Sequence, residues 1–220
     1  MNLKITDLYD LNHTRAAEYL AGFTYPWEAL AGISELIKAL GAQLPADEFD
    51  RIGEDVWIAK DATVFTTAYI HGPCIIGHKT EVRQCAFIRG SALVGDNCVV
   101  GNSTELKNVI LFDNVQVPHY NYVGDSILGY KAHMGAGSIT SNVKSDKLLV
   151  VIHNEGEEIE TGRKKVGALI GDGVEVGCNS VLNPGTVVGR DSNIYPLSCV
   201  RGVIPADSIY KMKNDIAEKY

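Results

Sequence analysis

Aliphatic residues recur at every sixth position between residues 52 and 106 of this 220-residue chain. Mostly small residues stand four positions after each of them, and glycine often follows the aliphatic residue directly. A period of six matches neither the 3.6-residue turn of a helix nor the two-residue alternation of a strand, so it predicts a repeat architecture. The aliphatic positions are Ile52, Ile58, Val64, Ile70, Ile76, Val82, Ile88, Val94, Val100 and Leu106.

Each six-residue unit is long enough for one short strand and one bend. The aliphatic side chain points inward, the small residue fills the corner, and glycine permits close backbone approach. Three units close a triangular coil, and the coils stack as parallel strands about 4.8 Å apart. The pattern therefore predicts a mainly β protein with a parallel β-helix, and it resembles the hexapeptide-repeat, left-handed β-helix acyltransferases. The left hand is implied by that resemblance alone, because ordinary parallel crossovers are right-handed.

The six-residue period is shortened at two steps and interrupted once by an insert. The steps from Leu106 to Leu111 and from Val123 to Leu128 are five residues instead of six, which predicts coils of seventeen residues. The repeat disappears over residues 139–168 and then resumes at Ile170. Because this insert contains a β-prone run, a turn around a glycine and a charged segment, we expect a hairpin arm.

The ends of the chain do not carry the repeat. Within residues 1–50 we expect a short helix over 16–21 and a second helix that begins at Pro26 and ends at Gly41. These helices are predicted to cap the first open coil, with a share in subunit contacts as the alternative. The β-helix is predicted over residues 51–204. Residues 205–220 are expected to form a C-terminal helix with Ile209, Met212 and Ile216 on one face.

Composition limits the partners and the compartment. The formal net charge is −7 and no long run of Lys or Arg is present, which argues against a nucleic-acid partner. No apolar stretch is long enough to span a membrane and the N-terminus lacks a signal-peptide pattern, so no membrane partner and a cytoplasmic location are expected. The five cysteines include no C-x-x-C pair, which favours reduced thiols.

Stacking of the coils brings polar residues together. An eighteen-residue coil places Arg89 beside Lys107, and neighbouring like charges on a sheet are destabilising. An anion such as phosphate between them would relieve this repulsion, whereas the alternative is that both side chains splay into solvent. The seventeen-residue coil places Glu105 beside Tyr122 and His119 beside Ala136.

His119 is the candidate base of this cluster. A histidine near a carboxylate has its basic form and its orientation tuned for proton abstraction. The alternative is an inert surface histidine. A zinc site of the carbonic anhydrase kind would need three converging histidines. The spacing of His71, His78 and His119 does not resemble that arrangement, so no metal is predicted.

Three segments carry a more specific resemblance, and they cover residues 100–107, 119–125 and 134–142. Together with Arg89, they resemble the acetyltransferase half of bifunctional N-acetylglucosamine-1-phosphate uridyltransferase. They are also similar to the C-terminal domain of archaeal sugar-1-phosphate nucleotidylyltransferases, which the segment 161–171 resembles more closely. A nucleotidyltransferase half is not expected here, because fewer than 52 residues precede the repeat and they contain no Gly-rich phosphate loop.

The resemblance implies acetyl transfer from the co-substrate acetyl-CoA to the amine of an amino-sugar 1-phosphate, glucosamine-1-phosphate or a similar sugar. It also implies a homotrimer that acts in amino-sugar metabolism and UDP-N-acetylglucosamine biosynthesis. His119 would be the general base, Glu105 would support it, and the Ala136 N–H would stabilise the oxyanion. The residues implied to bind the sugar phosphate are Arg89, Lys107, Tyr122, His133 and Asn142. Those implied to contact CoA are Ala136, Asp172, Lys144, Lys147, Arg163 and Lys164, and Lys165 belongs to the same basic segment of the insert.

Three positions depart from the family pattern. His133 stands where the family has a substrate-contacting Asn, Val143 replaces a Tyr, and Asp172 replaces a Ser near the cofactor. Two other functions therefore stay open. One is a non-catalytic trimeric scaffold, or a sugar-phosphate-binding partner of a separate nucleotidyltransferase. The other is an acyltransferase with a different acceptor, such as a nucleotide-linked amino sugar or serine.

Overall fold

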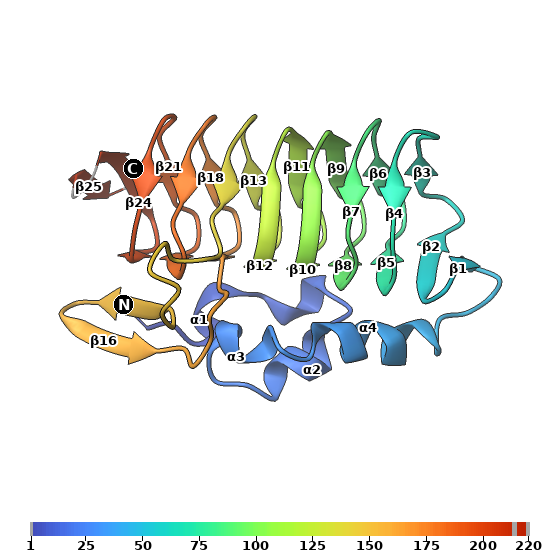
Figure 1. Ribbon diagram of the computed structural model, residues 1–220, viewed down its shortest axis with the longest axis horizontal. Helices are drawn as coiled ribbons and strands as arrows, with labels where there is room; N and C mark the ends of the chain where they lie inside the picture. The colour runs from blue at the N-terminus through green and yellow to red at the C-terminus, as the bar shows by residue number, and fades with distance from the viewer. Residues whose placement is uncertain (1, 213–214, 219–220) are drawn as a thin grey trace.

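The chain winds three walls of short parallel strands around one apolar core (Figure 1). The computed structural model describes residues 2–212 and 215–218. Each coil passes through the first, second and third wall in turn before the next coil begins. The parallel β-helix predicted from the six-residue period is therefore confirmed.

Each wall consists of parallel strands from successive coils. The first wall contains β2 (Val56–Ala59), β5 (Cys74–Ile76), β8 (Ala92–Val94), the ends of β10 (Glu105–Leu111) and β12 (Tyr122–Leu128), β17 (Ala168–Ile170), β20 (Thr186–Val188) and β23 (Val203–Ile204). The second wall contains β3 (Thr63–Val64), β6 (Glu81–Val82), β9 (Val99–Asn102), β11 (Gln116–His119), β13 (His133–Met134), β18 (Glu175–Val176), β21 (Asn193–Ile194) and β24 (Ser208–Met212). The third wall contains β4 (Tyr69–Ile70), β7 (Phe87–Ile88), the starts of β10 and β12, β14 (Ile139–Thr140), β19 (Val181–Leu182) and β22 (Cys199–Val200).

The register of the coils follows the predicted spacing. Ile88 pairs with Leu106 at eighteen residues, and Leu106 pairs with Val123 at seventeen. The shortened coils are therefore real, and they keep the aliphatic residues stacked inside. Leu111 and Leu128, where the sequence steps by five, are both fully buried.

The first wall is buried on both of its faces. Side chains alternate across a strand, so one residue of each three-residue strand in this wall points outward. All of these outward residues are apolar and buried, which is typical of a parallel sheet covered on both sides. They are Trp57, Ile75, Leu93, Ile110, Ile127, Leu169 and Val187.

The N-terminal helices form that cover. They lie along the length of the β-helix rather than over its end (Figure 1), so the expected cap on the first open coil is wrong in its position. At Gly41, a Cβ would collide with the ring of Trp57, which explains a glycine at the close approach of helix and wall. The expected second helix is divided in two. The elements are α1 (Ile5–Leu8), the 3-10 turn η1 (Leu11–His13), α2 (Ala17–Ala21), α3 (Pro26–Ala29) and α4 (Ile33–Gly41).

Antiparallel strands cover the edges of the β-helix. The strand β1 (Phe49–Gly53) pairs with β2, so Ile52 lies outside the core with 61% of its surface exposed and does not begin the repeat as expected. At the other end, β24 pairs with β21 and with β25 (Asp215–Glu218). The expected C-terminal helix is therefore wrong, because residues 208–210 continue the second wall as one more strand.

The insert is the expected hairpin arm. The strands β15 (Val151–Asn154) and β16 (Glu157–Glu160) pair antiparallel. The excursion begins later than expected, because β14 still pairs with β12 and β19. Thr140 takes an inward position, where its hydroxyl accepts a hydrogen bond from the Gly124 N–H at 3.0 Å. Because Thr140 is polar, the aliphatic repeat does not reveal β14, the strand that precedes the insert.

No helix in the described part of the chain is both long enough and apolar enough to cross a membrane.

Candidate active site

The three corners of the β-helix carry different chemistry. The aspartate corner, between the first and second walls, holds Asp96, Asp113 and Asp172. The histidine corner, between the second and third walls, holds His119 and Ala136. The pocket corner, between the third and first walls, holds Ser91, Lys107, Asn108 and Asp125, and the insert leaves the β-helix at this corner after Thr140.

The third wall brings together part of the predicted site. Glu105 pairs in register with Tyr122, as predicted. Arg89 Nη1 lies 2.7 Å from Glu105 Oε1, and this hydrogen bond with its ion pair raises the pKa of Arg89. Both side chains are partly exposed, so a ligand can reach them.

Asn142 joins the third wall to the pocket corner. Its Nδ2 donates to Tyr122 Oη at 3.1 Å and to Asp125 Oδ2 at 2.6 Å. Burial raises the pKa of the Tyr122 phenol, and the nearby carboxylates add to this effect. Because Tyr122 accepts from Asn142, its own hydroxyl proton remains available to a ligand.

Asp125 is the buried centre of this network, and it was missed in the sequence. Only 3% of its side chain is exposed. Its carboxylate accepts from Lys107 Nζ at 3.1 Å and from Asn108 Nδ2 at 2.9 Å. Each of the two stacked cations, Arg89 and Lys107, has its own carboxylate partner within the chain, and an external anion shared between them stays a prediction.

His119 lies at the end of β11, one corner away from Glu105. Its backbone N–H donates to Asn121 Oδ1 at 3.1 Å, and Asn121 is buried and donates to the Gly135 carbonyl at 2.9 Å. This network fixes the backbone that carries the imidazole. Ala136 follows one coil later, as predicted, since the Gly137 N–H donates to the His119 carbonyl at 3.0 Å. Among the described residues, no side-chain contact joins His119 to Glu105.

Two predicted site residues lie elsewhere. His133 is on the second wall, where its Nδ1 is 2.6 Å from Glu175 Oε2. Asp172 is on the aspartate corner, where it accepts from the N–H groups of Tyr130 at 2.7 Å and Asp10 at 2.6 Å. Both side chains thus have partners away from the third wall, and their expected roles at the sugar and at CoA stay predictions.

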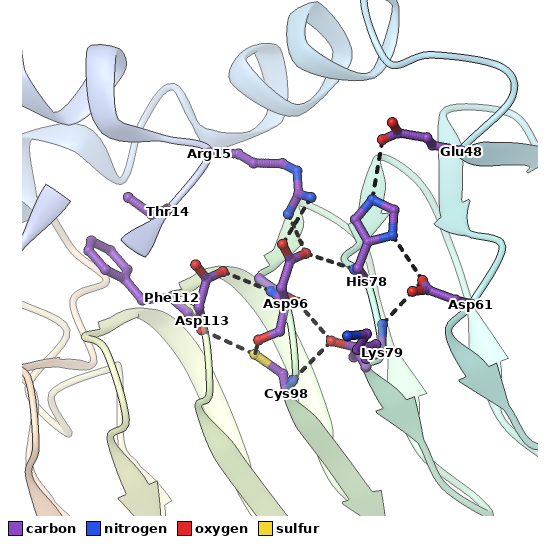
Figure 2. Close-up of polar contacts among 12 residues, drawn as sticks. Thr14, Arg15, Glu48, Asp61, His78, Lys79, Asp96, Cys98, Phe112 and Asp113 are labelled. Atoms are coloured by element: carbon purple, nitrogen blue, oxygen red, sulfur yellow. Dashed lines mark hydrogen bonds and ion pairs between the residues drawn. The ribbon is translucent and has the colours of Figure 1, made fainter. Parts of the chain in front are cut away.

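The aspartate corner is a structural link, as Figure 2 shows. Arg15 reaches from the N-terminal segment to Asp96, with Nη1–Oδ1 and Nη2–Oδ2 distances of 2.6 and 3.2 Å. Asp96 Oδ1 also accepts from the His78 N–H, and Asp113 Oδ1 accepts from the Asp96 N–H. Glycine at position 77 is required here because a Cβ would collide with the Asp96 carboxylate.

The basic residues of the insert divide into two groups. Lys144 forms an ion pair with Asp146 at 3.1 Å, and Lys147 lies nearby in the same turn. Arg163 and Lys164 line a cavity of about 560 Å³ together with Lys107. A bridge between Val143 and Lys165 holds the two ends of the insert side by side.

The arrangement suits an anionic, hydroxyl-rich ligand. The third wall presents a guanidinium, a carboxylate and a phenol in one row, and the adjoining corner presents an ammonium group. Guanidinium and ammonium groups bind phosphate through charge-assisted hydrogen bonds. An imidazole at the next corner is a candidate proton acceptor.

The fold and these residues define the chain as a parallel β-helix of the hexapeptide-repeat class. The family model described as the GMPPB C-terminal domain matches residues 70–214, which is more than half of the chain. The chain therefore belongs to the family of GMPPB C-terminal domains.

Curated relatives agree with this assignment. The chain is similar to a bifunctional protein GlmU of Methanococcus maripaludis, with 29% identity over 97% of this chain and 52% of the relative. It is also similar to a bifunctional sugar-1-phosphate nucleotidylyltransferase/acetyltransferase of Sulfurisphaera tokodaii, with 31% identity over 74% of this chain and 40% of the relative. A GlmU protein of Methanococcus aeolicus is 32% identical over 88% of this chain and 47% of the relative. The chain thus spans about half the length of the curated relatives it matches.

Solved structures give a weaker likeness. The polySia-specific acetyltransferase NeuO is 14% identical with a TM-score of 0.46, over 77% of this chain and 78% of NeuO. A hexapeptide transferase family protein of Anaplasma phagocytophilum is 15% identical with a TM-score of 0.42, over 75% of this chain and 80% of that protein. The description of the fold therefore depends on the strand pairing of this chain itself.

Proposed function

We propose that the chain is an N-acetyltransferase that moves the acetyl group of acetyl-CoA to the amine of an amino-sugar 1-phosphate, such as glucosamine-1-phosphate. One observation carries the proposal: Arg89, Glu105 and Tyr122 form one row on the third wall, next to the corner that presents His119. The similarity to bifunctional GlmU and sugar-1-phosphate acetyltransferase proteins supports the same reaction class.

In the proposed reaction the sugar amine attacks the acetyl carbonyl of acetyl-CoA. A C–N bond forms, the C–S bond breaks, and CoA leaves as a thiol after it receives the proton that the amine gives up. His119 accepts that proton as general base, and Glu105, on the neighbouring wall, is assigned to support it. The Ala136 N–H, at the same corner, stabilises the developing oxyanion.

The sugar phosphate is placed against Arg89, Lys107, Tyr122 and Asn142. Each of these side chains either carries a positive charge or presents a hydrogen-bonding group at the row or at its end. Lys144 and Lys147 are assigned to the phosphates of CoA. Both lie in the exposed turn at the start of the insert, which suits contact with a long co-substrate.

A homotrimer completes the proposed site. The third wall has partly exposed aromatic residues, Tyr69 and Phe87, in the same outward column as Glu105 and Tyr122. The second wall carries mostly polar residues at the equivalent positions. A neighbouring subunit packed on the third wall would cover the aromatic pair and close a crevice over His119.

The test incubates the protein with acetyl-CoA and either glucosamine-1-phosphate or galactosamine-1-phosphate. The acetylated sugar is followed by mass spectrometry, because the exposed thiols of Cys85, Cys178 and Cys199 would react with a thiol dye. His119→Ala is expected to slow turnover by about 10²–10⁴-fold. His153→Ala, on the hairpin arm, is the matched control and should turn over as wild type. Turnover that survives His119→Ala would rule out the assigned base.

A second candidate is a sugar-phosphate-binding module without catalysis. The 2.7 Å pairing of Glu105 with Arg89 favours it, because this pairing occupies the carboxylate that is assigned to assist His119. Such a module binds the sugar phosphate and leaves acetyl-CoA intact. The same incubation therefore separates the two candidates when it is combined with a direct measurement of sugar-phosphate binding.

A further inference from the structure

Three segments that are distant in the sequence meet at the pocket corner. The cavity of about 560 Å³ has walls from the N-terminal segment, from the corner of the β-helix and from the basic end of the insert. Its size is that of a small-molecule site. The lining residues are Leu30, Ala31 and Ser34, then Ser91, Lys107, Asn108 and Asp125, then Gly162, Arg163, Lys164 and Lys165.

The charge of this cavity is opposite to that of the protein. The chain as a whole carries a formal charge of −7, yet four cations and one carboxylate line the cavity. That carboxylate, Asp125, is fully engaged, because it accepts from Lys107, Asn108 and Asn142. Among the described residues no carboxylate pairs with Arg163, Lys164 or Lys165, so these cations give the cavity a positive field.

Arg163 has an unmet hydrogen-bonding group. Its Nε is buried from solvent and has no hydrogen-bond partner in the described part of the chain. Buried polar groups are almost always paired, so the unpaired Nε shows that no acceptor in the described chain holds this guanidinium, which lines the cavity and leaves its charge open to an anionic ligand. The N-terminal end of α4 points to the same ligand class. Ser34 lines the cavity in the first turn of this helix, and no side chain caps that turn.

We infer that the pocket corner binds a phosphorylated ligand by its phosphate groups, held between the basic end of the insert and the N-terminal segment. The inference touches the proposed function only through Lys107, and it adds a phosphate site that one chain builds without a neighbouring subunit. It assigns Arg163 and Lys164 to this site together with Lys107 and Lys165. It also gives the N-terminal segment a part in ligand recognition in addition to its role as a cover.

The test measures binding and requires no acetyl transfer, so its failure is distinct from failure of the proposed function. Inorganic phosphate and pyrophosphate are titrated into the protein by calorimetry at low salt. The double variant Arg163→Gln/Lys164→Gln is expected to weaken binding by at least about tenfold, since each charge-assisted hydrogen bond contributes strongly to affinity. The control Arg201→Gln/Lys131→Gln makes the same chemical change at exposed positions outside the cavity and should bind as wild type.

A second variant tests the wall made by the N-terminal segment. Ala31 is exposed at the rim, so Ala31→Trp adds bulk without disturbing the core, and it is expected to weaken binding by a similar factor. Tighter binding of pyrophosphate than of phosphate supports the site and assigns it to diphosphate-linked ligands, whereas equal binding supports it and assigns it to monoesters. Two results overturn the inference: no binding of either anion by wild type, or an equal loss in the control double variant.

Discussion

Two corners of the β-helix place aspartates next to the same N-terminal segment, yet they differ in how far their polar groups are paired. At the aspartate corner, the Asp96 carboxylate meets the guanidinium of Arg15 and a backbone N–H. At the pocket corner, Asp125 is paired, but Arg163 and its two neighbouring lysines have no acidic partner among the described residues. At the first corner the arginines Arg15 and Arg190 face carboxylates of the chain, although Arg190 Nε lacks a hydrogen-bond partner there as well, whereas the second corner has surplus positive charge.

This difference separates a structural contact from a ligand site. Pairing offsets the cost of removing charges from water, so the contact of Arg15 with Asp96 serves to attach the N-terminal segment. Unpaired cations around a cavity repel one another and lower stability until an anion binds. Both corners use arginine, and the partners of the arginine decide its role.

The largest effect is expected from Asp125→Ala. Removal of this buried carboxylate leaves Lys107, Asn108 and Asn142 without their shared acceptor, and we expect the free energy of unfolding to fall by about 3 kcal/mol. Urea unfolding at fixed protein concentration measures it. Asp47→Ala, at an exposed position, is the control for loss of an acidic side chain.

The matched substitution at the other corner is Asp96→Ala. It is expected to cost about 2 kcal/mol, because the Asp96 side chain is 28% exposed and its main partner is one guanidinium. Pyrophosphate binding should not change in this variant. A loss of binding, or a change in stability of less than about 1 kcal/mol for Asp125→Ala, would contradict the division between a structural and a ligand-binding corner.

Smaller changes in stability, of opposite direction, are expected when the arginine of each corner is replaced. Arg15→Gln removes a two-pronged contact and should destabilise the protein by about 1 kcal/mol. Arg163→Gln relieves repulsion with Lys164 and Lys165, so stability should rise slightly or change by less than about 0.5 kcal/mol. Urea midpoints of the two variants give the comparison. A clear destabilisation by Arg163→Gln would mean that its charge is already paired.

Much of the β-helix was predictable because its register depends only on spacing. The side-by-side positions of Glu105 and Tyr122, and the seventeen-residue coil that produces them, follow from counting. The position of the N-terminal helices along the β-helix does not follow from the inward-facing residues of the repeat. The outward residues Ile75, Leu93 and Ile127 are apolar in successive or nearby coils of one wall, and that column was the available signal for a lengthwise cover.

The other wrong predictions share one physical cause: the outcome depends on contacts between distant segments, which the local sequence does not encode. Ile52 has the spacing of the repeat, but its strand pairs antiparallel with β2. The residues of β24 have helix-like spacing, yet the open edge of β21 binds them as a strand. The meeting of Arg163 with Lys107 depends on the path of a 27-residue excursion between β14 and β17, which no periodicity describes.

The smallest expected effect concerns Asp113 and the pH dependence of stability. Burial raises the pKa of this carboxyl and the neighbouring Asp96 charge adds to the shift, while a backbone hydrogen bond, Arg15 and His13 oppose it. The folded protein therefore holds this proton more tightly than the unfolded chain, whose value is 3.8. The stability that this group contributes is complete below that value and decreases as pH rises through the folded pKa.

Asp113→Asn removes the titration and keeps the Oδ1 acceptor for the Asp96 N–H. The stability of the variant relative to wild type should therefore increase with pH, by less than about 1 kcal/mol between about pH 3 and pH 7. Asp61→Asn gives the matched opposite case. Burial opposes the shift there, but hydrogen bonds from His78 and the Lys79 N–H hold the pKa of Asp61 below its usual value, so its variant should lose relative stability as pH rises. Urea unfolding across this pH range compares the two slopes, and slopes of the same sign would contradict a raised pKa of Asp113 beside a lowered pKa of Asp61.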